Sequence, residues 1–190
     1  MHLIPGEELI GKIEQKTLNK RRNIMSCEYY KKALKLIKEN EKLLVKSKGA
    51  ELEVIQLAEK KLGVKFPEVY KQFLKDFGTL TFEALEVYGI VDNELIDESG
   101  VPDGIWYTLD ERLRYNFPNE LLIIADFGTG ELYCLDLSSN NEYGKVIAYI
   151  PGYDDNEQIR EVIADNFGEF LYKQIEEEIE FEKQYEKQYE

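Results

Sequence analysis

Residues that enzymes use for proton transfer and nucleophilic attack are scarce in this chain of 190 residues. His2 is its only histidine and stands at the very start, so mechanisms that need a histidine base, a Cys–His pair or several histidine ligands are effectively excluded. No serine lies in a G-x-S-x-G segment, and the serines stand instead in turn or capping contexts. These observations remove many classes of enzyme.

Two other motifs could hold a phosphate or a metal ion, and each has a simpler structural interpretation. Gly128-Thr129-Gly130 resembles a phosphate loop, but it links two expected strands and no Lys-Ser or Lys-Thr pair follows it, which favours a hairpin turn. Asp154 and Asp155 are the best candidates for paired-carboxylate or metal chemistry, yet their place before an expected helix favours capping. We therefore expect no catalytic residue, no metal site and no cofactor.

Cysteine use and hydropathy indicate the compartment. The two cysteines, Cys27 and Cys134, lack metal-like spacing and fall in an expected helix and an expected buried strand, so we expect reduced, structural thiols. No apolar run approaches the length of a membrane span, and the first residues, MHLIPGEELIGK, lack the features of a secretory signal. The sequence predicts a cytoplasmic protein.

The charge is strongly negative and unevenly spread, with a formal net charge of −14. Residues 1–50 hold 12 Lys or Arg against 6 Asp or Glu, whereas residues 51–190 hold 12 against 32. A domain this acidic repels nucleic acid and anionic membranes, but it attracts a basic protein partner and speeds the encounter with it. The alternative is charge that serves only solubility.

The N-terminal part divides into an extension and a helix. Residues 1–25 include the basic cluster 20–22 and have no sustained periodicity, so we expect a loosely ordered basic extension. A helix is expected to begin just after Met25 and to break near residues 47–49. Its apolar face is formed by Tyr30, Ala33, Leu34, Ile37 and Leu44.

The segment 51–89 has the clearest helix boundaries in the chain. The apolar residues of two expected helices recur at helical spacing: Leu52, Ile55, Ala58 and Leu62, then Tyr70, Phe73, Leu74 and Phe77. Gly63 and Gly78 stand where left-handed residues end helices, and Pro67 stands at the first position of the second helix. Aromatic and β-branched residues in 79–89 then indicate a strand.

The remainder of the chain is expected to form strands and a closing helix. Expected strands cover 105–109, which contains the only tryptophan, Trp106, then 121–125, 131–137 and 145–150. The closing helix is expected to begin near Asp155 or Asn156 and to carry an apolar stripe formed by Ile159, Val162, Ile163, Phe167, Phe170, Leu171, Ile175 and Ile179. This order predicts an α+β fold with an antiparallel-dominated sheet covered by helices. The expected domain spans 26–175, followed by an acidic helical tail, 176–190.

Three groups of residues resemble the SUKH superfamily, whose founding members are yeast cell-wall-synthesis regulators of the Smi/Knr type. The first group is Ile55, Glu59, Leu62-Gly63, Phe66-Pro67, Tyr70, Phe73-Leu74, Gly78 and Val87-Tyr88-Gly89. The second is the expected hairpin in 122–136, which includes Tyr133-Cys134-Leu135-Asp136. The third is 163–171, IADNFGEFL, which resembles the family's closing helix motif with Asn166 in place of the usual serine. The resemblance covers 51–173.

This resemblance implies an α+β fold with a single curved sheet, no enzymatic activity and, in bacteria, a role as an immunity protein. Such an antitoxin binds and neutralises the toxin domain of a polymorphic or contact-dependent toxin, often a nuclease. Carboxylates of an acidic domain would then occupy a basic nuclease surface in place of phosphates. The alternatives are a regulatory scaffold like the yeast members, and an enzyme that uses paired carboxylates and a metal.

An acidic loop, 91–104, and nearby aromatic residues are the candidate contacts with such a partner. Loops of this length tend to be functional, and its acidic residues do not fit the spacing of a calcium loop. For Trp106 the alternative is core packing. The candidate contact residues are Asp92, Glu94, Asp97, Glu98, Asp103, Trp106, Tyr153, Asp154 and Asp155.

Overall fold

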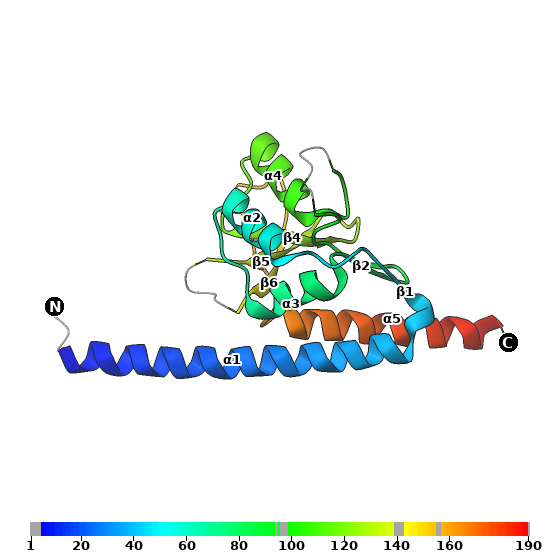
Figure 1. Ribbon diagram of the computed structural model, residues 1–190, viewed down its shortest axis with the longest axis horizontal. Coiled ribbons are helices and arrows are strands. Elements are labelled where there is room, and N and C mark those ends of the chain that lie inside the picture. Colours follow the sequence, from blue (N-terminus) through cyan, green and yellow to red (C-terminus); the bar gives the residue numbers. More distant parts are fainter. Residues whose placement is uncertain (1–4, 94, 96–98, 139–142, 155–156, 190) are drawn as a thin grey trace.

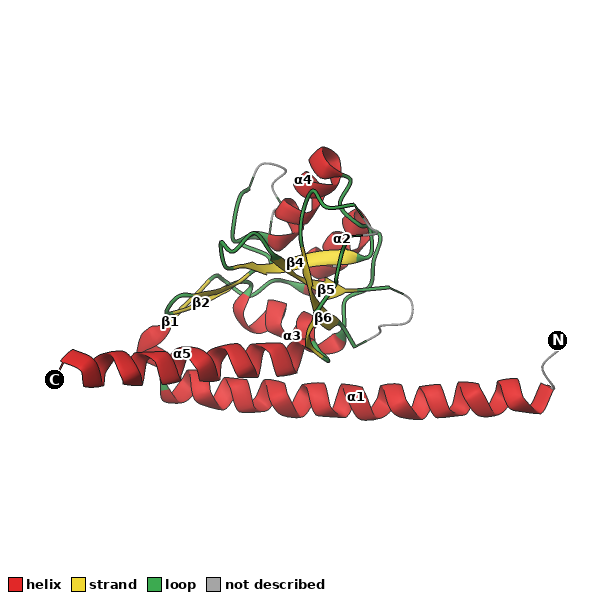
Figure 2. Cartoon of the chain, turned by 180° about the vertical axis from the view of Figure 1, so that it is seen from behind, coloured by secondary structure: helices red, strands yellow, loops and turns green. Residues whose placement is uncertain are grey.

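Two long helices lie side by side along one side of the protein, and the rest of the chain packs above them (Figure 1). The structure is a computed structural model that describes residues 5–93, 95, 99–138, 143–154 and 157–189. Helices α1 (Pro5–Glu39) and α5 (Phe167–Tyr189) run in the same direction, and the N-terminal part of α1 extends beyond the body (Figures 1 and 2). The two helices approach closely at Gly168, where an added Cβ would overlap the carbonyl oxygen of Ser26.

Helix α1 begins far earlier than the expected start after Met25, and the chain is helical from Pro5 onward. Proline is well tolerated at the first position of a helix, and residues 12–39 contain no glycine or proline that would end one. The sequence lacks apolar periodicity there because this part of the helix projects beyond the body (Figure 1). Arg22 ties α1 to the body through the hydroxyl group and ring of Tyr143.

The next two helices agree with the sequence prediction. Helix α2 (Leu52–Leu62) ends at Gly63, which has a left-handed φ of 72° and donates its N–H to the Glu59 carbonyl oxygen. Helix α3 (Glu68–Phe77) directly follows Pro67 and buries an aromatic face. In the core, Tyr70 meets Phe167 of α5 edge-on at 5.0 Å between ring centroids. The closing helix is thereby packed against α3.

A buried carboxylate joins α2 to the start of α3. Glu59 is only 3% exposed, and its carboxylate accepts hydrogen bonds from Lys65 Nζ at 2.9 Å and from the Phe66 N–H at 2.8 Å. Lys71 Nζ lies 3.5 Å from the same carboxylate. Burial alone would raise the pKa of Glu59, but these partners outweigh it and the pKa is lowered. Glu59, part of the resemblance, therefore has a structural role.

The described residues form two antiparallel sheets (Figure 2). The first has the order β1-β2-β3 and the second β4-β5-β6-β7. Their bounds are β1 (Leu44–Lys46), β2 (Leu80–Phe82), β3 (Leu85–Val87), β4 (Leu121–Asp126), β5 (Leu132–Asp136), β6 (Lys145–Tyr149) and β7 (Val162–Ala164), and a short 3-10 helix, η1 (Glu41–Leu43), precedes β1. The α+β class is confirmed, whereas the expected single sheet is replaced by two. The two sheets adjoin where the Tyr88 N–H donates to the Ile124 carbonyl oxygen at 2.7 Å, and the next residue, Gly89, forms an isolated parallel bridge with Asp103.

Two further element predictions are wrong. The expected strand 105–109 is instead the start of helix α4 (Gly104–Tyr115). The closing helix begins at Phe167 and not near Asp155, because Ile159 lies in a loop and Val162 belongs to β7. Asn166 caps α5 by accepting the Glu169 N–H at 2.9 Å. The apolar spacing in 159–163 thus belongs to a loop and a strand.

Alternate residues of β4 face two different parts of the core. Leu122 and Ile124 belong to the main core with α3 and α5, whereas Leu121 and Ile123 pack in a smaller cluster with Phe117, Cys134 and Tyr149. Strand β4 is the edge of its sheet, and α4 covers this edge. Among the described residues, no helix is long and apolar enough to cross a membrane.

Candidate functional site

Helix α4 is attached to the body along its inner face. The Thr108 hydroxyl oxygen accepts the Ile123 N–H of β4 at 3.0 Å. The guanidinium group of Arg112 donates to the Leu62 carbonyl oxygen at 2.8 Å and to the Asn119 carbonyl oxygen at 2.6 Å. These bonds join α4 to α2 and to the sheet. They fix the position of α4 on the body, while the sides of the helix that make none of these bonds can contact other groups.

Asp103 caps the N-terminus of α4. Its carboxylate accepts the N–H groups of Ile105 at 3.0 Å and of Trp106 at 2.9 Å, and the residue is 3% exposed. Burial raises the pKa of Asp103, and the charge of Asp92 adds to this effect, although the hydrogen bonds oppose it. The expectation that Asp103 belongs to an exposed acidic surface is therefore wrong, because its carboxylate is used inside the protein.

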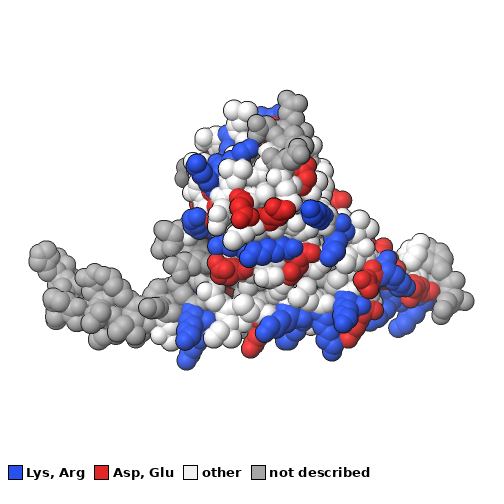
Figure 3. All heavy atoms as spheres, in the orientation of Figure 1, with Lys and Arg blue, Asp and Glu red and all other residues white. Residues whose placement is uncertain are grey.

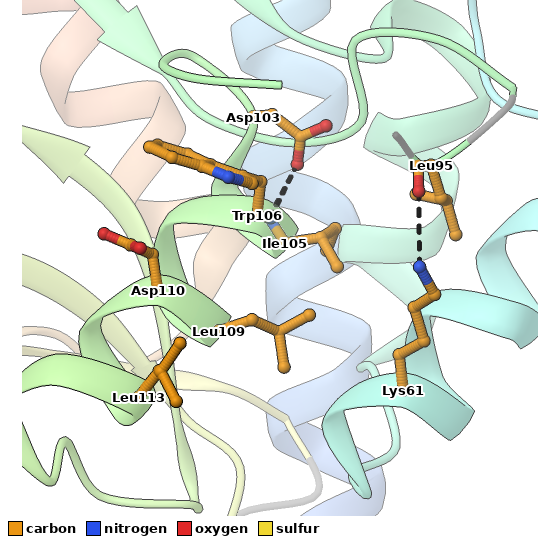
Figure 4. A pocket seen from close by; sticks show the side chains of 8 residues that line it. All are labelled: Lys61, Leu95, Asp103, Ile105, Trp106, Leu109, Asp110 and Leu113. Carbon is orange, nitrogen blue, oxygen red and sulfur yellow. Dashed lines mark hydrogen bonds between the residues drawn. The ribbon is translucent and has the colours of Figure 1, made fainter. Parts of the chain in front are cut away.

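A pocket of about 160 Å³ lies between α4, Lys61 of α2, and the residues Leu95 and Asp103 (Figure 4). Ile105 and Leu109 point from α4 toward Lys61 of α2 and Leu95, whereas Trp106 extends on the other side of the Asp103 cap (Figure 4). Lys61 closes one side by donating to the Leu95 carbonyl oxygen at 3.2 Å. The pocket thus has apolar walls and a charged rim.

Apolar side chains at and near this pocket are exposed at the surface. Leu113, one helical turn beyond Leu109, is 84% exposed, and Val101 is exposed just before the cap. Trp106 is half-buried and stacks on Tyr107 with ring centroids 6.3 Å apart. We call Trp106, Leu109 and Leu113, which all line this pocket, the α4 patch. A half-buried tryptophan on a fixed helix is the kind of aromatic anchor that is enriched at protein–protein contacts.

The other predicted contact residues fall into three groups. Asp92 is half-buried near Asp103, whose pKa its charge raises. Tyr153 and Asp154 are exposed in a turn after β6, where the Asp154 carbonyl oxygen accepts the Glu157 N–H at 2.8 Å instead of capping a helix. The remaining residues, Glu94, Asp97, Glu98 and Asp155, lie outside the described residues. The structure therefore brings Asp92, Asp103 and Trp106 together, and places Tyr153 and Asp154 on a separate loop.

Sequence reasoning missed the partners of Trp106 in this site. Leu109 and Leu113 follow it at helical spacing, and Lys61 comes from α2. The sequence contains a signal that could have identified this helix. Asp103 stands at a capping position, and the apolar residues Trp106, Leu109 and Leu113 follow it at spacings of three and four.

Charge is also distributed by element. Lys and Arg side chains are frequent along the lower edge of the molecule, with some Asp and Glu among them, and both kinds of charge occur on the body above (Figure 3). Exposed lysines of α1 include Lys31, Lys35 and Lys38. Among the described residues, these lysines of α1 thus lie on the side of the protein away from α4. Among the described residues, no group of three or more His, Cys, Asp or Glu is arranged to hold a metal ion.

The fold and the α4 patch define an α+β protein with an exposed apolar surface suited to binding another protein. Residues 52–171 match the SUKH_6 family, described as SMI1-KNR4 cell-wall. This match covers more than half of the chain, and the chain belongs to that family. The resemblance to the SUKH superfamily is thus confirmed. Comparison with curated proteins gave no significant match.

Proposed function

We propose that this protein is an immunity protein that binds a cognate toxin domain through the surface around α4 and blocks its active site. The observation that carries the proposal is the α4 patch, in which Trp106 and the exposed Leu113 stand on a helix fixed to the body. Membership of the SUKH superfamily, which includes immunity proteins and Smi1/Knr4-like proteins, supports it. Such a protein acts by stoichiometric binding and needs no catalysis of its own.

The charge distribution supports a basic partner, and a nuclease domain is the class of toxin that fits best. A nuclease grips phosphates with Lys and Arg, so an acidic protein can occupy that surface with carboxylates. The net charge of −14 would speed the encounter, and burial of the apolar α4 patch would slow dissociation. The proposal places the protein in the cytoplasm, where a nuclease would meet nucleic acid.

A regulatory scaffold is the second candidate function. The description of the matched family names the cell wall, and the basic face of α1 offers a binding surface separate from the α4 patch. A scaffold for several endogenous partners would use both surfaces. The absence of a neighbouring gene for a large secreted protein with a variable C-terminal domain would favour this function over immunity.

Co-expression with the toxin domain encoded beside this protein tests the immunity proposal. The parent chain should restore growth and co-purify with the toxin as a one-to-one complex. Leu113→Asp should abolish rescue without unfolding the protein, because the Leu113 side chain is 84% exposed. The matched control is Leu52→Asp, which places the same charge on an exposed leucine at the start of α2 and should retain rescue. Failure of the parent chain to rescue growth or to form a complex would overturn the proposal.

A further inference from the structure

A second pocket, of about 360 Å³, lies on the opposite flank of α4 from the α4 patch. Tyr107, Glu111 and Tyr115 line it from successive turns of the helix, since residues four apart share one side. The remaining wall comes from the end of β4 and the turns that follow β4 and β6, including Asp126, Gly130 and Gly152. We call this space the Glu111 pocket.

Glu111 is the unusual residue in this pocket. It is only 8% exposed, yet its carboxylate has no hydrogen bond or ion pair with any described residue. Arg114, the cation whose charge acts on Glu111, is bound at 2.8 Å to Asp110 instead. Burial raises the pKa of Glu111, and the charges of Asp110 and Asp126 raise it further. The Glu111 carboxylate therefore faces the pocket, and no cation among the described residues is bound to it.

The other groups of the pocket supply a second acceptor and aromatic surface. Asp126 is half-buried, and one of its carboxylate oxygens accepts the Gly128 N–H at 2.8 Å. Burial, together with the charges of Asp126 and Glu111 and a hydrogen bond to Asp126, raises the pKa of Tyr107 to about 12, so Tyr107 is neutral. Its ring contacts Trp106 and Tyr88 and adds aromatic surface beside Glu111. Tyr115 is exposed at the outer end of the pocket.

We propose that the Glu111 pocket receives the guanidinium group of an arginine side chain presented by the protein partner. A guanidinium group is planar, donates hydrogen bonds to carboxylates in pairs and stacks on aromatic rings, so it matches Glu111, Asp126 and the tyrosines. An ammonium group would satisfy the charge but makes less use of the rings. Hard divalent cations take six or more oxygen ligands, for which this pocket offers few carboxylates. The identity of the partner rests on the proposed function, whereas the chemistry of the pocket does not.

Peptide binding tests the pocket without any toxin. The probe is acetyl-Gly-Arg-Gly-amide, and the matched controls replace arginine with citrulline, which is neutral, or with lysine. Backbone amide resonances of Tyr107, Tyr115, Gly130 and Gly152 should shift saturably with the arginine peptide, with a dissociation constant on the order of 1–10 mM. The citrulline peptide should cause no such shift, and the lysine peptide should bind several-fold more weakly.

Two variants assign the effect to the carboxylates. Glu111→Gln should weaken arginine binding at least about tenfold and should fold normally, because no described residue is bonded to the carboxylate that it replaces. Asp126→Asn keeps the acceptor for the Gly128 N–H and should weaken binding by a smaller factor. Glu180→Gln, an exposed position on α5, should bind like the parent.

Several results would overturn the proposal. These are no localised shift with the arginine peptide, equal shifts with citrulline or lysine, and unchanged binding in Glu111→Gln. Shifts of the same resonances by submillimolar MgCl₂ alone would show a metal site instead. If the peptide binds but no toxin does, the pocket stands and the immunity proposal fails. If a toxin binds Glu111→Gln as tightly as the parent, immunity stands and the pocket proposal fails.

Discussion

The N-terminal cap of α4 provides a prediction that separates a structural role for Asp103 from a role in partner contact. The change is Asp103→Ala, with Asp103→Asn as the matched control. Asparagine keeps a side-chain oxygen that can accept the N–H groups of Ile105 and Trp106, whereas alanine removes both acceptors. Both variants remove the negative charge, so the two differ only in the cap.

The expected magnitude follows from these two hydrogen bonds. Loss of an N-terminal cap costs about 0.5–2 kcal/mol. The Ile105 N–H is in a residue that is 2% exposed, and a buried donor without an acceptor costs about 1–3 kcal/mol. Removing a buried carboxylate of raised pKa offsets part of this loss, so we expect Asp103→Ala to lower the free energy of unfolding by about 2 kcal/mol. Asp103→Asn should stay within about 1 kcal/mol of the parent.

Urea unfolding followed by circular dichroism measures both variants against the parent. For a protein of this size the alanine variant should also melt about 4–8 °C lower. Equal stability of the alanine and asparagine variants would refute the capping argument. Equal loss of partner binding in two stable variants would show instead that Asp103 acts through its charge.

Three further substitutions test how the scaffold is held together. Glu59→Gln should lower the free energy of unfolding by about 2–4 kcal/mol near pH 7. Because folding lowers the pKa of Glu59, this difference between variant and parent should shrink as the pH falls from the pKa of Glu59 in the unfolded chain toward its pKa in the folded protein. Urea titrations at several pH values would measure this change. Gly168→Ala should destabilise by about 1–3 kcal/mol, because the new Cβ overlaps the Ser26 carbonyl oxygen, and an unchanged melting temperature would contradict the observed approach of α1 to α5. Thr108→Val should leave the buried Ile123 N–H without an acceptor and cost about 1–3 kcal/mol, whereas Thr108→Ser should cost less; equal melting temperatures would argue against this bond.

The segments that the sequence predicts well are those whose boundaries are set by local residues. Gly63 and Gly78 end α2 and α3, and Pro67 precedes α3, because left-handed glycine and proline act on the backbone regardless of the rest of the fold. The resemblance to the SUKH superfamily rests partly on these same residues. It therefore identifies the scaffold, whereas the residues that we propose as partner contacts lie mostly outside the positions that carry it.

The errors arise where distant contacts outweigh local preference. Ile105, Trp106 and Tyr107 favour a strand by propensity, but the Asp103 cap and the bond from the Ile123 N–H to Thr108 hold them in a helix. The sequence indicates Trp106 as a candidate contact only through its residue type, the single tryptophan of the chain. The pocket beside it could not be predicted, because its walls come from α4, Lys61 of α2, and the residues Leu95 and Asp103, which are brought together only by the tertiary fold.

Titration calorimetry of the purified toxin domain against this protein tests the central claim most directly. The account predicts one-to-one binding by the parent, binding at least about a hundredfold weaker for Trp106→Ala and Leu113→Asp, and parent-like binding for Leu52→Asp. Binding that is equal in all four proteins would show that the α4 patch is not the contact surface. No binding by the parent would contradict the immunity function itself.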